Sequence, residues 1–178
     1  MTANENEVHR ADFDELEGYS ELWIDTRLPN HERTLYNLIG THVSEDPDVE
    51  AGIPPADNSI GGFNIGIIEA SPGNGAAYHD HETVEVFIPL TGRWEIYYGE
   101  DNDELEGEER AILEPWDAIQ VSPGVYRGFR NAGDDDAYLM AITGGQDPGR
   151  ITWPEMIIEQ AEERGLTRDE EGNLVELD

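Results

Sequence analysis

Between Gly62 and Gly145, apolar and polar residues alternate in short runs that are separated by clusters of Gly, Pro and Asp. The runs are FNIGIIEA, AYHDHETVEVFIPL, GRWEIYYG, RAILEPWDAIQV, VYRGFRNA and AYLMAITGG. Alternation with a period of two residues is typical of half-buried strands, and many short strands at this spacing are typical of antiparallel sandwiches and barrels. The pattern therefore predicts an all-β domain.

The segments around this region complete the predicted organisation. ELWIDTRL (21–28) and TLYNLIGTHV (34–43) are expected to be two more strands, and the loop 44–62, rich in Pro, Gly and acids, is expected to act as a lid or an interface arm. The chain is thereby divided into an acidic N-terminal arm, a β-barrel, and a C-terminal helix with its tail, at residues 1–18, 19–150 and 151–178.

The segment TWPEMIIEQAEERG predicts a short C-terminal helix. Thr152 is the expected N-cap, Glu155 would complete a capping box, and Pro154 suits the first turn. Gly165 is a typical helix stop. An apolar stripe is expected to pack on the barrel, along the face formed by Trp153, Ile157, Gln160, Ala161 and Arg164.

The charge of the chain is extreme. The sequence contains 41 acidic residues, ten arginines and no lysine, and its net charge is −31. This surplus disfavours nucleic acids and anionic membranes as partners, because both are polyanions. A folded domain with this charge repels itself in dilute buffer, whereas molar salt screens the repulsion. The composition resembles that of proteins from salt-accumulating halophiles, in particular haloarchaea.

Other absences narrow the expected function. The chain has no cysteine, which excludes disulfides, thiolate metal sites and cysteine nucleophiles. The N-terminal sequence lacks a signal-peptide pattern, and no run approaches 18 apolar residues. We therefore expect a cytoplasmic protein.

Three side chains in one predicted strand point to metal chemistry. His79, His81 and Glu85 stand at even spacing, so they share one face if the strand is unbroken. Two imidazoles and a carboxylate are a typical ligand set for a divalent metal, and they leave coordination positions open. Asp80 and Tyr78 would point to the opposite face.

The spacing Gly73-x5-His79-x-His81-x3-Glu85-x6-Gly92 resembles the first motif of the cupin superfamily. PWDAIQVSPGVYRGFRN resembles the second motif, and the likeness spans residues 62–142. Trp116 stands where that motif begins with glycine. The matching positions of the second motif are Asp117, Gly124, Phe129 and Asn131, with Pro123 one residue late. The resemblance implies a cupin jelly-roll β-barrel and a metal held by the three ligands; it also favours a homodimer, because cupins commonly pair through their sheets.

Arg127 stands where the family has its fourth ligand, a histidine. Arginine stays protonated, so it cannot ligate a metal and would repel one. Four arrangements are open: Arg127 turned away from the centre, a nearby acid, an anionic substrate between arginine and metal, or a pocket without metal. His31 and His42 are further candidates for a fourth ligand.

The resemblance implies chemistry on a small organic molecule, such as a dioxygenase, isomerase or lyase reaction. The ion could be Fe, Mn, Ni, Cu or Zn, since each accepts two histidines and a glutamate. Arg127 would hold a substrate carboxylate, and Trp94 and Phe129 are expected to line the cavity with it. The alternative is a cupin that binds a small ligand without catalysis or without metal.

Overall fold

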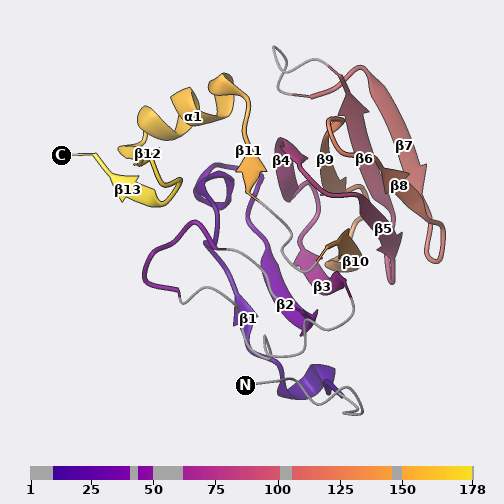
Figure 1. Cartoon of the computed structure of the whole chain (residues 1–178). Helices are drawn as coiled ribbons and strands as arrows, with labels where there is room; N and C mark the ends of the chain where they lie inside the picture. The colour runs from indigo at the N-terminus through magenta and orange to yellow at the C-terminus, as the bar shows by residue number, and fades with distance from the viewer. Residues whose placement is uncertain (1–9, 41–43, 50–61, 101–105, 146–149, 178) are drawn as a thin grey trace.

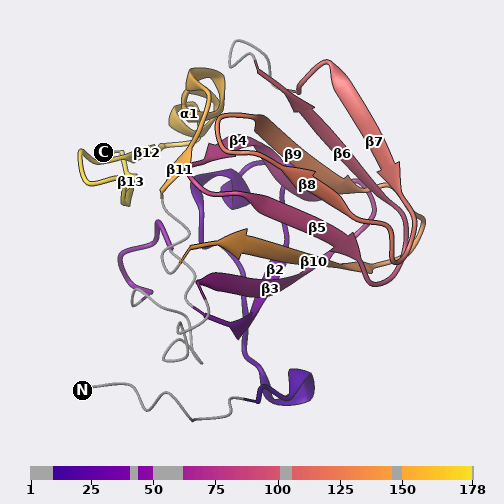
Figure 2. The ribbon, with the colours of Figure 1, turned by 45° about the vertical axis from the view of Figure 1, so that its right-hand side comes forward.

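The computed structural model describes residues 10–40, 44–49, 62–100, 106–145 and 150–177. Two antiparallel sheets face each other as layers (Figure 2). The six-stranded sheet has, in spatial order, β1 (Gly18–Tyr19), β2 (Thr34–Ile39), β3 (Phe63–Ala70), β10 (Ala137–Gly144), β5 (Glu85–Pro89) and β8 (Ile119–Val121). The five-stranded sheet has β11 (Ile151–Thr152), β4 (Gly75–His81), β9 (Tyr126–Asn131), β6 (Trp94–Gly99) and β7 (Glu109–Leu113).

The main core fills the space between the two sheets. Strand β10 alternates strictly between buried and half-buried residues, as the sequence pattern predicts. Phe87 of one sheet packs against Phe129 of the other with ring centroids 5.2 Å apart, and Trp94 lies 6.0 Å from Phe129. Burying each of these side chains stabilises the fold by roughly 1.5–3 kcal/mol. The all-β prediction is confirmed.

Two of the predicted long strands are broken, and each break moves the chain between sheets. AYHDHETVEVFIPL forms β4 and β5, which belong to different sheets, with a turn over residues 82–84. RAILEPWDAIQV forms β7 and β8, again in different sheets. In the second turn, the Asp117 carboxylate accepts the Glu114 N–H at 2.9 Å, and Trp116 adopts a positive φ of 75°. Period-two alternation does not reveal such breaks, because both flanking strands keep it.

The prediction of a strand over 21–28 is wrong. Ile24–Arg27 form a short 3-10 helix, η2. Its bend is fixed by Asp25, whose buried carboxylate accepts two hydrogen bonds from Arg33, at 2.8 and 3.0 Å, and a third from the Ala77 N–H. Ala77 lies 52 residues further along the chain, so a tertiary contact overrides the local strand preference. Of the strand predicted over 34–43, residues 34–39 are confirmed as β2; Gly40 lies in a bend, and residues 41–43 lie outside the described residues.

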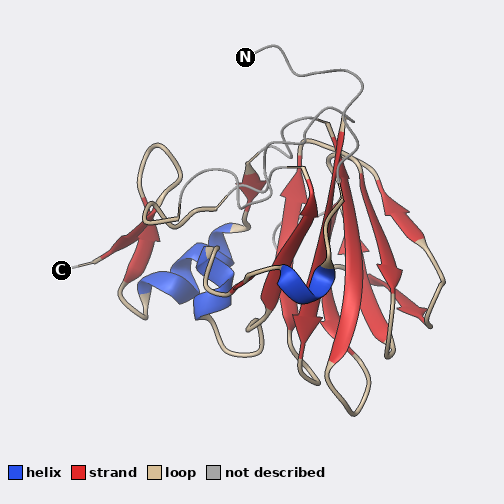
Figure 3. Cartoon of the chain, turned by 90° about the horizontal axis from the view of Figure 1, so that it is seen from below, coloured by secondary structure: helices blue, strands red, loops and turns tan. Residues whose placement is uncertain are grey.

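The C-terminal helix α1 (Glu155–Glu162) lies outside the barrel, against η2 (Figure 1). Its buried face has the predicted apolar residues, and Trp153, Ile157 and Ala161 pack with Ile24 and Ala77 in a second cluster. After the helix, β12 (Leu166–Arg168) and β13 (Leu174–Glu176) form a hairpin that the sequence analysis does not anticipate. Figure 3 shows the helix between this hairpin and the barrel.

The predicted N-cap of this helix is wrong. Thr152 belongs to β11, where it pairs with Asp80 of β4. Its backbone therefore pairs in the sheet, and the helix starts at Glu155, two residues later than an N-cap at Thr152 would place it. Pro154 occupies the N-cap position and makes no side-chain capping bond.

The described part of the N-terminal arm packs on the six-stranded sheet. Phe13, in a one-turn 3-10 helix η1 (Phe13–Glu15), lies 5.0 Å from the Tyr36 ring and 5.8 Å from the Tyr138 ring. Residues 1–9 lie outside the described residues, as does 50–61 of the loop expected to act as a lid or arm. None of the helices in the described chain is long and apolar enough to cross a membrane.

Candidate metal centre

Strand β4 delivers two histidines to the inside of the barrel. Its pairing with β9 shifts between Ala76 and His79, because three residues of β4 advance against two of β9. Such a bulge lets Ala76, His79 and His81 all line the same internal cavity. Tyr78 packs instead against Tyr97, with stacked rings 6.2 Å apart, as expected for a side chain that points away from the site.

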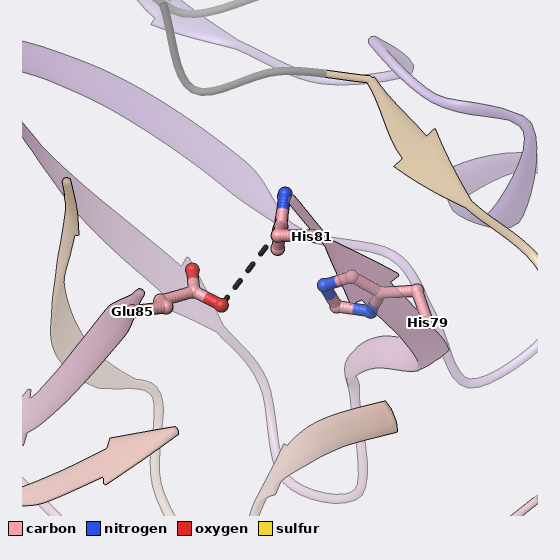
Figure 4. A group of neighbouring side chains, drawn as sticks. All are labelled: His79, His81 and Glu85. Carbon is pink, nitrogen blue, oxygen red and sulfur yellow. Dashed lines mark ion pairs between the residues drawn. The ribbon is translucent and has the colours of Figure 1, made fainter. Parts of the chain in front are cut away.

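The carboxylate comes from the facing sheet. Glu85 is the first residue of β5, and its side chain points toward the two histidines (Figure 4). One ligand atom from each of the three residues lies within 4.8 Å of the others, and His81 Nε2 is 3.7 Å from Glu85 Oε2. The three residues therefore converge as predicted. The reason is different: two strands face each other across the barrel, rather than one unbroken strand presenting all three.

The surroundings of His79 prepare it to bind a metal, whereas Glu85 must lose a proton to do so. His79 Nδ1 lies 2.6 Å from the Ala77 carbonyl oxygen, so this nitrogen carries the proton and Nε2 keeps its lone pair. Burial, together with the neighbouring His81 and Arg127, lowers the pKa of His79 and keeps it neutral. Burial also raises the pKa of Glu85 to about 7, although Arg127 acts in the opposite direction.

The donor set fits a divalent transition metal. Two ligands bonded to one ion at roughly 2.1 Å lie about 3 to 4.2 Å apart, depending on the angle between them. The His81–Glu85 separation of 3.7 Å already falls in this range, and the 4.8 Å limit for the group requires only a small inward adjustment. Glu85 Oε2 is buried and accepts no hydrogen bond within the described residues.

Arg127 lies inside the barrel beside this group. It pairs with His79 in the β4–β9 register, and its side chain is fully buried. Its Nε is 3.2 Å from Glu85 Oε2, and its Nη1 donates to Asp80 Oδ1 at 3.2 Å. Of the four arrangements left open by the sequence, the structure has the one with a nearby acid, and two acids share the guanidinium.

The other candidates have separate outcomes. Among the described residues that line the cavity is Phe129, whereas Trp94 lies in the core, with its indole N–H bonded to the Thr91 carbonyl, and does not reach the cavity. His31 is engaged with the Gly75 carbonyl, 3.3 Å away, and is not part of the ligand group. His42 lies outside the described residues.

The ligand group lies in a cavity of about 280 Å³, and residues from distant parts of the chain form its mouth. Arg33, Glu45, Arg150 and Arg168 line it together with the Glu171–Asn173 turn between β12 and β13. The sequence analysis missed all of them. They have no local signature, because only the folding of the C-terminal segment across the barrel brings them together.

Glu45 connects the mouth to three parts of the chain. Its buried carboxylate accepts the Ile24 N–H at 2.9 Å, the Trp153 indole N–H at 2.9 Å and Arg168 Nη1 at 2.7 Å. Its backbone carbonyl accepts the Leu174 N–H. These bonds fix the C-terminal hairpin beside the cavity, and Trp153 in turn packs on the His79 ring at 5.3 Å.

Comparison with known proteins supports the cupin superfamily. No family model matches the chain. A curated relative, germin-like protein subfamily 1 member 5 of Arabidopsis thaliana, is 29% identical over 98 residues, which cover 54% of this chain. The matched region spans 44% of that protein's length.

Solved structures share the fold at low sequence identity. A cupin 2 domain-containing protein from Halorhodospira halophila superposes with a TM-score of 0.53 at 16% identity, covering 74% of this chain and 77% of the other. The polyketide cyclase RemF from Streptomyces resistomycificus gives a TM-score of 0.54 at 15% identity, covering 82% and 84%. The predicted cupin jelly-roll architecture with a short C-terminal helix is thus confirmed.

Proposed function

We propose that this cupin-fold chain binds a divalent transition-metal ion through His79, His81 and Glu85 and takes a small organic molecule beside it. The observation that carries the proposal is the convergence of three buried ligand atoms within 4.8 Å, contributed by two facing sheets, at a cavity of about 280 Å³. Buried ionisable groups are costly, and a metal would satisfy all three at once.

When bound, such an ion supplies Lewis acidity and open coordination positions for the small molecule. The protein residues position the ligands and exclude water. His79 is held in one tautomer by the Ala77 carbonyl, and the apolar walls formed by Phe129, Ile68 and Ala141 exclude water around the site. If the protein is an enzyme, the proposal is a metal-dependent reaction of the dioxygenase, isomerase or lyase type.

Arg127 adjusts the charge of the centre in this proposal. It pairs with Glu85 and Asp80, so its guanidinium already has two carboxylate partners without a substrate. It is fully buried and is not among the described residues that line the cavity. We therefore assign it to positioning Glu85 and not to holding a substrate carboxylate.

A second candidate function is small-molecule binding without metal. The Arg127–Glu85 contact at 3.2 Å favours it, because the guanidinium offsets the charge of the buried carboxylate in the absence of an ion. The two candidates differ in a simple respect: only the first requires that the three side chains bind metal together.

Cobalt(II) titration of metal-free protein tests the choice. The proposal expects d–d absorption bands that saturate at one equivalent and disappear in Glu85→Gln. His31→Gln is the matched control, since His31 is a partly buried histidine outside the ligand group, and it should keep the bands. Absence of bands from wild-type protein would favour the metal-free candidate.

The acidic composition is part of the proposal as well. We propose that the chain is adapted to molar salt, as in halophiles. Support comes from the net charge of −31 and the complete use of arginine over lysine. Screening by salt would relieve the repulsion that this surplus creates.

A further inference from the structure

We infer that the cavity mouth holds the anionic group of a small organic acid between Arg150 and Arg168. The inference rests on the proposed function, because it places the rest of that acid in the cavity above His79, His81 and Glu85. It names the substrate class and the residues that would recognise it.

Guanidinium groups are concentrated around the cavity of a chain that is otherwise strongly acidic. Three of the ten arginines line the cavity: Arg33, Arg150 and Arg168. Arg33 is neutralised by the buried Asp25 carboxylate, which it contacts at 2.8 and 3.0 Å. Arg150 is exposed and forms no ion pair or hydrogen bond with any described residue, so its charge is available to a ligand.

The two remaining guanidiniums approach one point. A Cβ atom placed on Gly172 would lie 3.6 Å from Arg150 Nη1 and 3.8 Å from Arg168 Nη2. These nitrogens are therefore no more than about 7.4 Å apart. A carboxylate with oxygens about 2.2 Å apart, each accepting at about 2.9 Å, bridges nitrogens separated by up to about 8 Å. One anionic group can thus contact both arginines.

Arg168 is held in place by the fold. Arg168 Nη1 donates to Glu45 Oε1 and to the Ile151 carbonyl, which leaves Nη2 for a ligand. The turn after it is closed by Asp169, whose carboxylate accepts the Asn173 N–H at 2.8 Å and its side-chain N–H at 3.0 Å. A ligand that binds Arg168 therefore does not have to order this side chain, which lowers the entropic cost of binding.

Two acids at the mouth, Glu45 and Glu171, balance the formal charges of Arg150 and Arg168, so the site would recognise an anion through the N–H donors of the two arginines and not through a net positive charge. Glu45 lines the cavity, but its carboxylate already accepts three hydrogen bonds. Glu171 also lines the cavity; it is exposed, and it forms no ion pair with a described residue. Its replacement by glutamine should therefore strengthen anion binding. The cavity volume of about 280 Å³ restricts the ligand to an acid of a few carbons.

Calorimetric titration of succinate, glutarate and inorganic phosphate, with neutral succinamide as a fourth probe, tests the inference. Each probe is titrated into wild-type protein in metal-free and zinc-loaded form, and metal content is measured on the same samples. We expect succinate or glutarate to bind and succinamide not to bind. Arg150→Gln and Arg168→Gln should each weaken binding at least tenfold with unchanged metal content. Stronger binding of phosphate than of either dicarboxylate would overturn the assignment to an organic acid.

Arg164→Gln is the matched control, because Arg164 is exposed at the end of α1 and is not among the described residues lining the cavity. It should bind the acids as wild type does. Arg168 also supports Glu45, so Arg150→Gln, which removes no bond of the fold, is the decisive variant. Equal affinity of Arg150→Gln and wild type for every acid overturns the inference. Arginine-dependent anion binding by protein that takes up no metal supports this subsite and contradicts the metal proposal.

Discussion

Replacing Arg127 by glutamine should strengthen metal binding. Arg127 Nε is 3.2 Å from Glu85 Oε2, and a metal bonded to that oxygen at about 2.1 Å lies within roughly 5.3 Å of the guanidinium. At an effective dielectric constant of 20, the repulsion between a dication and one positive charge at this distance is about 6 kcal/mol. Removing the charge removes that repulsion.

Two effects act in the opposite direction. The arginine orients Glu85, and loss of a buried charged contact of this kind costs about 1–3 kcal/mol. Arg127 also lowers the pKa of Glu85, so without it that pKa rises above about 7 and the metal must displace a proton more often. An assay at pH 8.5 reduces this cost. The repulsion is larger than both. We therefore expect Arg127→Gln to bind zinc at least tenfold more tightly.

The assay is zinc titration in competition with a chelator at pH 8.5. Arg130→Gln is the matched control, since Arg130 lies on the same strand, pairs with Glu95 and Glu106, and is 38% exposed. Circular dichroism must show that Arg127→Gln folds, because breaking buried ion pairs can cost 3–5 kcal/mol of stability. Zinc affinity that is equal to or weaker than wild type in a folded variant would refute the reasoning.

Three further predictions concern stability. The pKa of Glu85 is about 7 in the folded, metal-free protein, against an ordinary value of 4.5. Between these two pH values the folded state holds a proton that the unfolded chain has released, so the stability of the metal-free protein falls as the pH rises from about 4.5 to 7. Chemical denaturation of the wild type should show a loss of up to about 3 kcal/mol in unfolding free energy over this pH range, and Glu85→Gln should not show it. Equal pH dependence of the unfolding free energy in the two proteins would contradict the prediction. Trp116→Gly should raise the unfolding free energy by about 1 kcal/mol, because Trp116 is 78% exposed and its φ of 75° strains a bulky residue; an unchanged or lower value argues against strain. The melting temperature should rise from 0.1 M to 1 M KCl as the Debye length shrinks from about 10 to 3 Å, and equal values would count against salt adaptation.

The sequence predicts the fold and the ligand group for separable reasons. Alternation predicts strands wherever one face is buried, so the all-β barrel follows from it. The spacing of His79, His81 and Glu85 predicts the ligand group within one strand, but the strand breaks at 82–84 and Glu85 belongs to the facing sheet. The prediction succeeds because the spacing also matches the cupin motif, which carries the three-dimensional arrangement that alternation lacks.

The contacts that individual side chains make cannot be predicted from the sequence pattern. Alternation puts Asp80 and Glu85 on opposite faces of one strand, yet the long guanidinium of Arg127 contacts both. Thr152 looked like an N-cap because its local signature is typical, but pairing with Asp80 commits it to β11. The substrate-binding role of Phe129 and the homodimer stay predictions.

The residues at the mouth of the cavity could not be predicted from the sequence either. Arg33, Glu45, Arg150 and Arg168 come from four separate segments and have no common spacing. The hairpin that carries Arg168 is held by the Glu45 carboxylate, more than a hundred residues earlier in the chain. Such long-range polar contacts leave no periodic signal in a sequence.

The most direct test of the metal centre is the metal content of His81→Ala beside that of wild type, with the melting temperature of each before and after saturation with zinc. The account predicts one tightly bound ion per wild-type chain and a higher melting temperature on loading, by mass action. His81→Ala should retain no stoichiometric ion and gain no thermal stability. A His81→Ala protein that holds one ion and is stabilised as much as wild type would contradict the central claim.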